Sequence, residues 1–181
     1  MATREDYEQL VAFSRIDGAL VGLLWIASFA FFIGEFYIPV FSDVSLVVGL
    51  SSVVFAAMRL RAFRNKVLDG AISYRRAFAY SVMTYFNAAL LMALAQYLYF
   101  QFIDGGFVIS KYMSIVSTKE FAALAAQSGM SKADIQLAIG NLASLRPIDI
   151  AFQFLGTNMI LGVIISLPVA FFIKSDRKIN K

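Results

Sequence analysis

The chain of 181 residues is 60% hydrophobic and only 15% charged, whereas a soluble globular domain is roughly 45–50% apolar and about 25% charged. This composition excludes an ordinary soluble domain and indicates that lipid surrounds much of the surface. Cys and His are absent, which removes thiol chemistry, the usual general base and the commonest metal ligand. We therefore expect no enzymatic activity, no metal and no cofactor, and we attribute the +4 net charge to membrane topology rather than to nucleic-acid binding.

The first apolar segment predicts a membrane span over about residues 17–38. No charged residue lies between Asp17 and Glu35, and we expect both acids at the ends of the span, within reach of solvent or headgroups. A cleaved signal peptide is the competing interpretation. Three acidic residues precede the segment, however, and no small-residue cleavage site follows it.

The second span is predicted over about residues 40–60. Its uncharged run from Val44 to Met58 is slightly short for a hydrocarbon core of about 30 Å, so it depends on a snorkelling Arg59 at its end. A re-entrant or interfacial helix is the alternative for this segment.

Two longer apolar segments predict the third and fourth spans, at about residues 77–103 and 150–173. The fourth follows Pro147 and contains Pro168, which is expected to bend the helix, either for packing or as a gating hinge. The predicted fold is therefore all-α, with four transmembrane helices in a single domain over residues 1–181.

Basic residues predict the orientation of the spans. They gather between the second and third spans and after the fourth, while the other two connections have no excess of Lys or Arg. This distribution places both termini in the cytoplasm. The basic residues of the two cytoplasmic segments are Arg59, Arg61, Arg64, Lys66, Arg75, Arg76, Lys174, Arg177, Lys178 and Lys181.

The connection at about residues 104–149 predicts an extracytoplasmic cap of two amphipathic helices. The first opens with the capping box Ser117-x-x-Glu120 and stops at a glycine, and the second opens at Ser131 with Asp134 and ends before a proline. Each helix has one apolar face. The cap either completes the core as a lid, contacts the lipid surface or recognises a partner.

Polar residues within the spans are few. Asn87, Gln96 and Asn158 are predicted to make interhelical contacts, and Asn158 shares a stripe with Gly162 and Ser166 that is typical of close helix packing.

Arginines at the cytoplasmic side are candidates for contacts with anionic lipid headgroups. Determination of topology alone is the competing explanation for them. These arginines are Arg59, Arg61, Arg64, Arg75 and Arg76.

Several segments together resemble the DUF4199 family of Bacteroidota membrane proteins. Where that family usually has a proline after the third span, this chain has Gly105-Gly106. The resemblance implies an inner-membrane protein without assigned catalytic residues, often encoded near a polyprenyl-phosphate glycosyltransferase. The segments are Arg61-Ala-Phe-Arg64, Asp69-Gly70-Ala-Ile72-Ser73-Tyr74, Ala77-Phe78, Tyr99-Phe100-Gln-Phe102-Ile103-Asp104 and Ser128-Gly129-Met130-Ser131.

Three functional hypotheses follow. The first is a non-enzymatic accessory or scaffold subunit that binds a protein partner or a second copy of the chain, in addition to membrane lipids. The second is a helper of envelope glycan assembly that interacts with lipid or polyprenyl phosphate. The third is a small transporter or channel, which would need paired broken helices near the midplane, whereas only Pro168 interrupts a span.

Overall fold

The computed structural model describes residues 4–175, apart from the side chains of residues 132 and 142. The described residues form seven helices and no strand, which confirms the all-α prediction. They divide into two compact units, the four-helix unit (residues 1–95 and 154–181) and the short-helix unit (residues 96–153). Of the predicted cytoplasmic residues, Arg177, Lys178 and Lys181 lie outside the described part of the chain.

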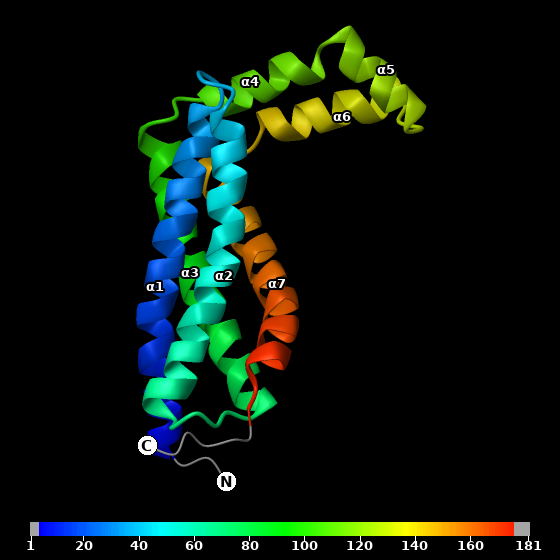
Figure 1. Cartoon of the computed structure of the whole chain (residues 1–181). Coiled ribbons are helices and arrows are strands. Elements are labelled where there is room, and N and C mark those ends of the chain that lie inside the picture. Colours follow the sequence, from blue (N-terminus) through cyan, green and yellow to red (C-terminus); the bar gives the residue numbers. More distant parts are fainter. Residues whose placement is uncertain (1–3, 176–181) are drawn as a thin grey trace. The chain divides into compact units, whose positions relative to one another are not determined.

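Four of the described helices are long and apolar enough to cross a membrane, as predicted. The shortest of them have 27 residues, or about 40 Å at about 1.5 Å per residue, which exceeds a hydrocarbon core of about 30 Å. These helices are α1 (Arg4–Gly34), α2 (Phe41–Val67), α3 (Tyr74–Phe102) and α7 (Pro147–Ile173) (Figure 1).

Helix α2 is longer than its apolar run. It continues past Arg59 to Val67, because Arg and Lys end an apolar segment but are good helix formers. The helix stops where Asp69 adopts a φ of 51° and the Gly70 amide donates to the Arg64 carbonyl at 2.9 Å, so a left-handed residue closes its end. The helix as a whole is therefore longer than the short uncharged run from which the second span was predicted.

Small residues let the helices of the four-helix unit approach closely. A Cβ atom on Gly18 of α1 would lie 2.6 Å from the Asn87 Cβ of α3, and one on Gly162 of α7 would lie 2.6 Å from the Tyr85 Cβ of the same helix α3. Ser166, one turn after Gly162, is fully buried. The predicted packing stripe on α7 is therefore confirmed at these two positions.

Helices α1 and α2 lie side by side (Figure 1) and are joined by polar contacts. The Trp25 indole donates to the Ser52 hydroxyl at 2.9 Å, and the hydroxyls of Ser28 and Ser45 each donate to the other's backbone carbonyl at 2.8 Å. Such hydrogen bonds help to hold helices together in lipid.

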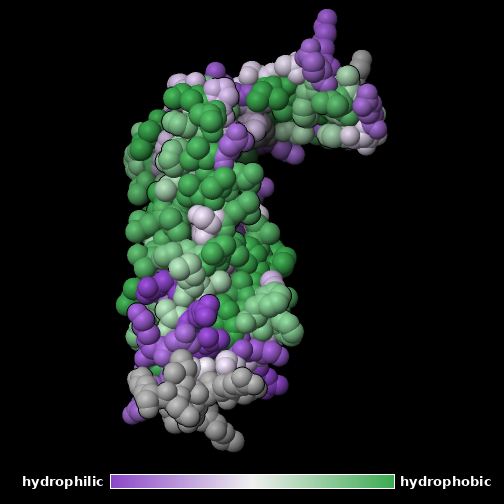
Figure 2. Space-filling view, in the orientation of Figure 1, coloured by the Kyte–Doolittle hydropathy of each residue, from purple (hydrophilic) through white to green (hydrophobic). Residues whose placement is uncertain are grey.

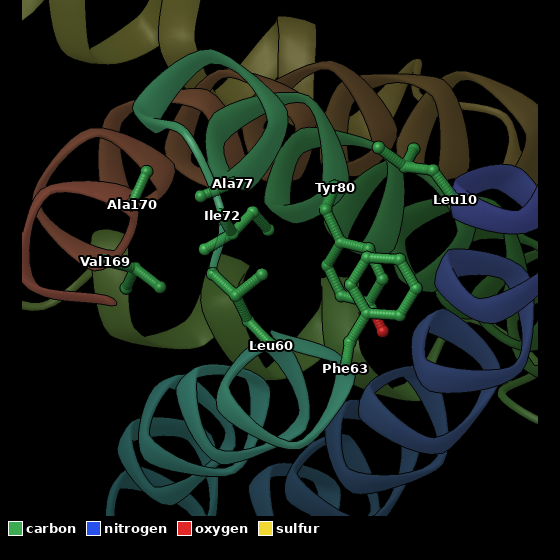
Figure 3. Close-up of a cluster of buried hydrophobic side chains, with 8 residues drawn as sticks. All are labelled: Leu10, Leu60, Phe63, Ile72, Ala77, Tyr80, Val169 and Ala170. Atoms are coloured by element: carbon green, nitrogen blue, oxygen red, sulfur yellow. The ribbon is translucent and has the colours of Figure 1, made fainter. Parts of the chain in front are cut away.

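One end of the four-helix unit has an apolar core to which all four long helices contribute (Figure 3). The rings of Phe63 and Tyr80 stack there with their centroids 4.5 Å apart. An antiparallel bridge between Ile72 and Ser175 joins the segment after α2 to the end of α7. Four helix ends therefore meet here: the start of α1, the end of α2, the start of α3 and the end of α7. This is the arrangement expected of successive helices that cross a membrane in opposite directions.

On the face seen in Figure 2, apolar residues cover most of the four-helix unit, and hydrophilic residues gather towards one end of it. Helix α2 shows the pattern clearly, because a row of its large apolar side chains is more than 60% exposed. This surface suits contact with lipid chains. The row consists of Leu46, Val47, Leu50, Val54 and Met58.

The short-helix unit contains three short helices in contact with one another (Figure 1): α4 (Phe107–Val116), α5 (Lys119–Gln127) and α6 (Lys132–Ala143). The prediction of two helices was wrong because α4 was missed. Gly105 and Gly106, both with positive φ, end the preceding segment, and the Asp104 carboxylate accepts from the Val108 amide at 3.1 Å in the first turn of α4.

The N-terminal caps of α5 and α6 differ in how well they agree with the sequence prediction. The capping residue of α5 is Thr118, whose hydroxyl accepts from the Phe121 amide, so the predicted box from Ser117 to Glu120 was wrong by one residue. For α6 the prediction is confirmed, since Ser131 and Asp134 each accept from the other's amide. The Ser131 hydroxyl and amide, both donors to Asp134, hold the pKa of this carboxyl below its usual value.

The contact at Gly162 gives a direct test of the packing. We expect Gly162→Ala to destabilise the protein by about 1–3 kcal/mol, because the added methyl group collides with Tyr85. The matched control is Gly156→Ala in the same helix, where an added Cβ meets nothing within 4 Å. Thermal unfolding in detergent measures both, and equal melting temperatures would contradict the described packing.

Candidate functional site

Asp17 of α1 is 1% exposed, so the expectation that solvent or headgroups reach it was wrong. One carboxylate oxygen, Oδ1, accepts from the Arg59 Nε of α2 at 2.7 Å. The other, Oδ2, accepts from the Tyr80 hydroxyl of α3. Three helices thus meet at one carboxylate.

Local packing explains why this acid is buried. Asp17 directly precedes Gly18, where α1 approaches α3 too closely to admit a side chain. A buried carboxylate without partners is very costly, and partners on both oxygens offset that cost. Tyr80 is itself held by its stack on Phe63, so the phenol that donates to Asp17 has a fixed position.

A pocket of about 110 Å³ opens beside this ion pair. Helices α1 and α2 provide its walls, and charged groups and aromatic rings share the lining. The lining residues are Phe13, Asp17, Arg59, Ala62, Phe63, Lys66 and Val67.

The predicted headgroup arginines do not act as one cluster. Arg59 is bound to Asp17, Arg64 donates to the Ile173 carbonyl at the end of α7 at 2.7 Å, and Arg76 lies 3.1 Å from the Asp6 carboxylate of α1. Arg61 and Arg75 are exposed and have no ion pair or hydrogen bond to the described residues. Three of the five therefore hold helices together.

The three predicted interhelical amides are also dispersed. The Asn87 amide donates to the Met83 carbonyl of its own helix at 2.7 Å. Gln96 is 2% exposed, and its Oε1 has no hydrogen-bond partner among the described residues. Asn158 is half-buried on α7. The structure brings none of these three together into a site.

The chemistry available here is charge recognition. Within residues 4–175, side chains 132 and 142 apart, no three acidic residues lie close enough to hold a metal ion. The pocket offers a guanidinium, an ammonium and apolar walls instead. These groups are suited to holding a ligand by its charge.

Sequence reasoning missed the pairing of Asp17 with Arg59, although a signal was present. Asp17 marks the start of the first apolar segment, and Arg59 marks the end of the second. Two successive spans are antiparallel, so these two boundaries lie at the same side of the membrane. Opposite charges there are candidates for an ion pair.

Fold and site together define a four-helix membrane protein in which the buried Asp17 carboxylate of one long helix pairs with Arg59 of the next. The chain belongs to the family described as protein of unknown function (DUF4199), which matches residues 17–175. The resemblance found in the sequence is therefore confirmed. No curated protein and no solved structure matches the chain.

A double-mutant cycle tests the ion pair. We expect Asp17→Asn and Arg59→Gln each to destabilise the protein, and the double variant to be about 1–2 kcal/mol more stable than the sum of the two effects predicts. The coupling is modest because the Arg59 side chain is 37% exposed and partly screened by solvent.

Thermal unfolding in detergent provides the four stabilities of this cycle. The control cycle pairs Asp17→Asn with Arg61→Gln, since Arg61 has no contact with Asp17 among the described interactions, and its effects should add. Additive effects in the Asp17–Arg59 cycle as well would show that the pair has no energetic importance.

Proposed function

We propose that this protein is a non-enzymatic accessory subunit of the inner membrane that binds a protein partner through its short-helix unit. The observation that carries the proposal is the exposure of apolar side chains on helices of 9 to 12 residues, which are too short to cross a membrane. The large apolar residues of these helices that are 37–67% exposed are Tyr112, Ile115, Leu124 and Leu137, and Met130 is exposed between α5 and α6.

The charge of this segment favours a protein over an anionic lipid surface. The connection carries four basic and four acidic residues, so its net charge is zero, whereas attraction to anionic lipids needs an excess of Lys and Arg. Aromatic residues and Met are enriched at protein interfaces. The eight charged residues are Lys111, Lys119, Lys132, Arg146, Asp104, Glu120, Asp134 and Asp149.

A non-enzymatic role is supported by the composition. The chain has no Cys and no His, and the buried Asp17 carboxylate already has a donor on each oxygen, Arg59 on one and Tyr80 on the other. The Asp17 carboxylate therefore has a structural role, and its oxygens are not available to act as a general base.

We further propose that both termini lie in the cytoplasm and the short-helix unit on the opposite side. The start of α1 and the end of α7 meet at the end of the four-helix unit where Arg59, Arg64 and Arg76 are placed. Basic residues favour the cytoplasmic side of an inner membrane.

The absence of Cys from the chain makes the orientation directly testable. We expect Ser128→Cys, at the end of α5, to react in intact cells with a maleimide that does not cross the inner membrane. Ser73→Cys, between α2 and α3, should react only after the cells are permeabilised. Both serines are exposed, so accessibility of the thiol is matched, and the reverse labelling pattern would overturn the proposed orientation.

Partner binding is tested by extraction of the tagged protein from native membranes in mild detergent. We expect a specific protein, or a second copy of the chain, to co-purify, and the double variant Leu124→Asn with Leu137→Asn to lose it by about tenfold or more, because both leucines are more than 60% exposed.

The matched control for this experiment is Gln127→Asn with Gln136→Asn, which changes exposed polar residues of the same two helices. The control should keep the partner. A monomer that captures nothing, or equal capture by both double variants, would count against the short-helix unit as the binding surface.

A further inference from the structure

The pocket beside Arg59 has a composition that the structural role of the ion pair does not explain. Only Asp17 is needed to fasten Arg59, yet the pocket also includes an ammonium group, Lys66, and the rings of Phe13 and Phe63. All of these residues belong to the four-helix unit.

Arg59 is positioned to donate hydrogen bonds to an anion. Its Nε is held by Asp17 at 2.7 Å, while its two terminal nitrogens make no hydrogen bond to any described residue. The side chain remains 37% exposed. Because the buried carboxylate already fixes the guanidinium, little side-chain freedom remains to be lost when an anion binds to the terminal nitrogens.

Lys66 extends the positive charge along the same face. It lies seven residues after Arg59 on α2, or two helical turns, so both side chains project from one side of the helix. Lys66 is exposed and has no ion pair with a described residue. With both oxygens of Asp17 occupied, the two cations outnumber the one acid in the pocket lining.

The position of the pocket along α2 identifies the kind of anion. Arg59 directly follows the uncharged run from Val44 to Met58, and Lys66 lies beyond it towards the basic connection. This is the boundary where the hydrocarbon region gives way to headgroups. The aromatic and aliphatic walls suit the apolar part of a lipid next to its charged group.

We propose that the pocket formed by Phe13, Arg59, Phe63 and Lys66 binds the phosphate group of an anionic membrane lipid. The guanidinium provides two donors to the phosphate oxygens, and the ammonium provides a third contact. Arg61 and Arg75, which do not line the pocket, contribute to topology without contacting this lipid. The inference is independent of the partner surface, because it concerns the other unit of the chain.

Native mass spectrometry of the full chain in detergent tests the proposal. Phosphatidylglycerol is titrated against phosphatidylcholine, and we expect the wild-type protein to retain the anionic lipid preferentially. Lys66→Gln should lower phosphatidylglycerol retention by roughly tenfold, and this variant leaves the Asp17–Arg59 pair intact. Arg59→Lys should lower it too, since lysine keeps the charge but loses the planar fork of donors.

The matched control is Arg75→Gln, which removes one positive charge from the same basic end outside the pocket. It should retain phosphatidylglycerol as the wild type does. Equal losses in Lys66→Gln and Arg75→Gln would overturn the proposal, because they would show attraction by net charge alone. Displacement of the lipid by millimolar inorganic phosphate would also overturn it, because the site would then recognise a free anion.

Discussion

A carboxylate that must be buried in a membrane helix constrains the whole basic end of this protein. Asp17 requires a partner for each oxygen, and it finds them on two other helices, Arg59 of α2 and Tyr80 of α3. Removal of Arg59 would leave the buried carboxylate without a counter-charge, and removal of Tyr80 would leave one carboxylate oxygen without a donor. The interaction therefore fixes the register of three helices, and the stack of Phe63 on Tyr80 transmits that register to the apolar core shared with α7.

Away from that end, the helices cannot rely on the hydrophobic effect, because lipid tails are as apolar as the side chains they would replace. Close packing of the helices and hydrogen bonds between them stabilise their association instead. Gly162 of α7 approaches α3 where any side chain would collide, and the Trp25 indole donates to the Ser52 hydroxyl. The large apolar residues of α2, by contrast, point outward to the surroundings. Beside the apolar core, burial in this fold thus includes polar residues such as Ser52 and Ser166.

The sequence predicted the parts of the fold that composition controls. The four spans were predicted from the length of the apolar segments alone, and the N-terminal cap of α6 was predicted from Ser131 and Asp134. Helix α4 was missed because its signal, a Gly-Gly pair before an apolar stretch, is easily taken for loop. The burial of Asp17 was missed for a different reason. Charge at the end of a span indicates solvent only when no neighbouring helix supplies a counterion, and helix proximity is a property of tertiary structure.

The same limit applies to the arginines, and it separates two uses of positive charge. Orientation in a membrane depends on how many basic residues lie on one side, with no requirement on their geometry. Binding a phosphate depends on donors that are fixed, uncommitted and convergent. Arg64 and Arg76 are committed to Ile173 and Asp6, and Arg61 and Arg75 are uncommitted but line no pocket. Arg59 alone of the five is held by the fold with its terminal donors open. A count of charges in the sequence cannot make that distinction, because it arises from the carboxylate of another helix.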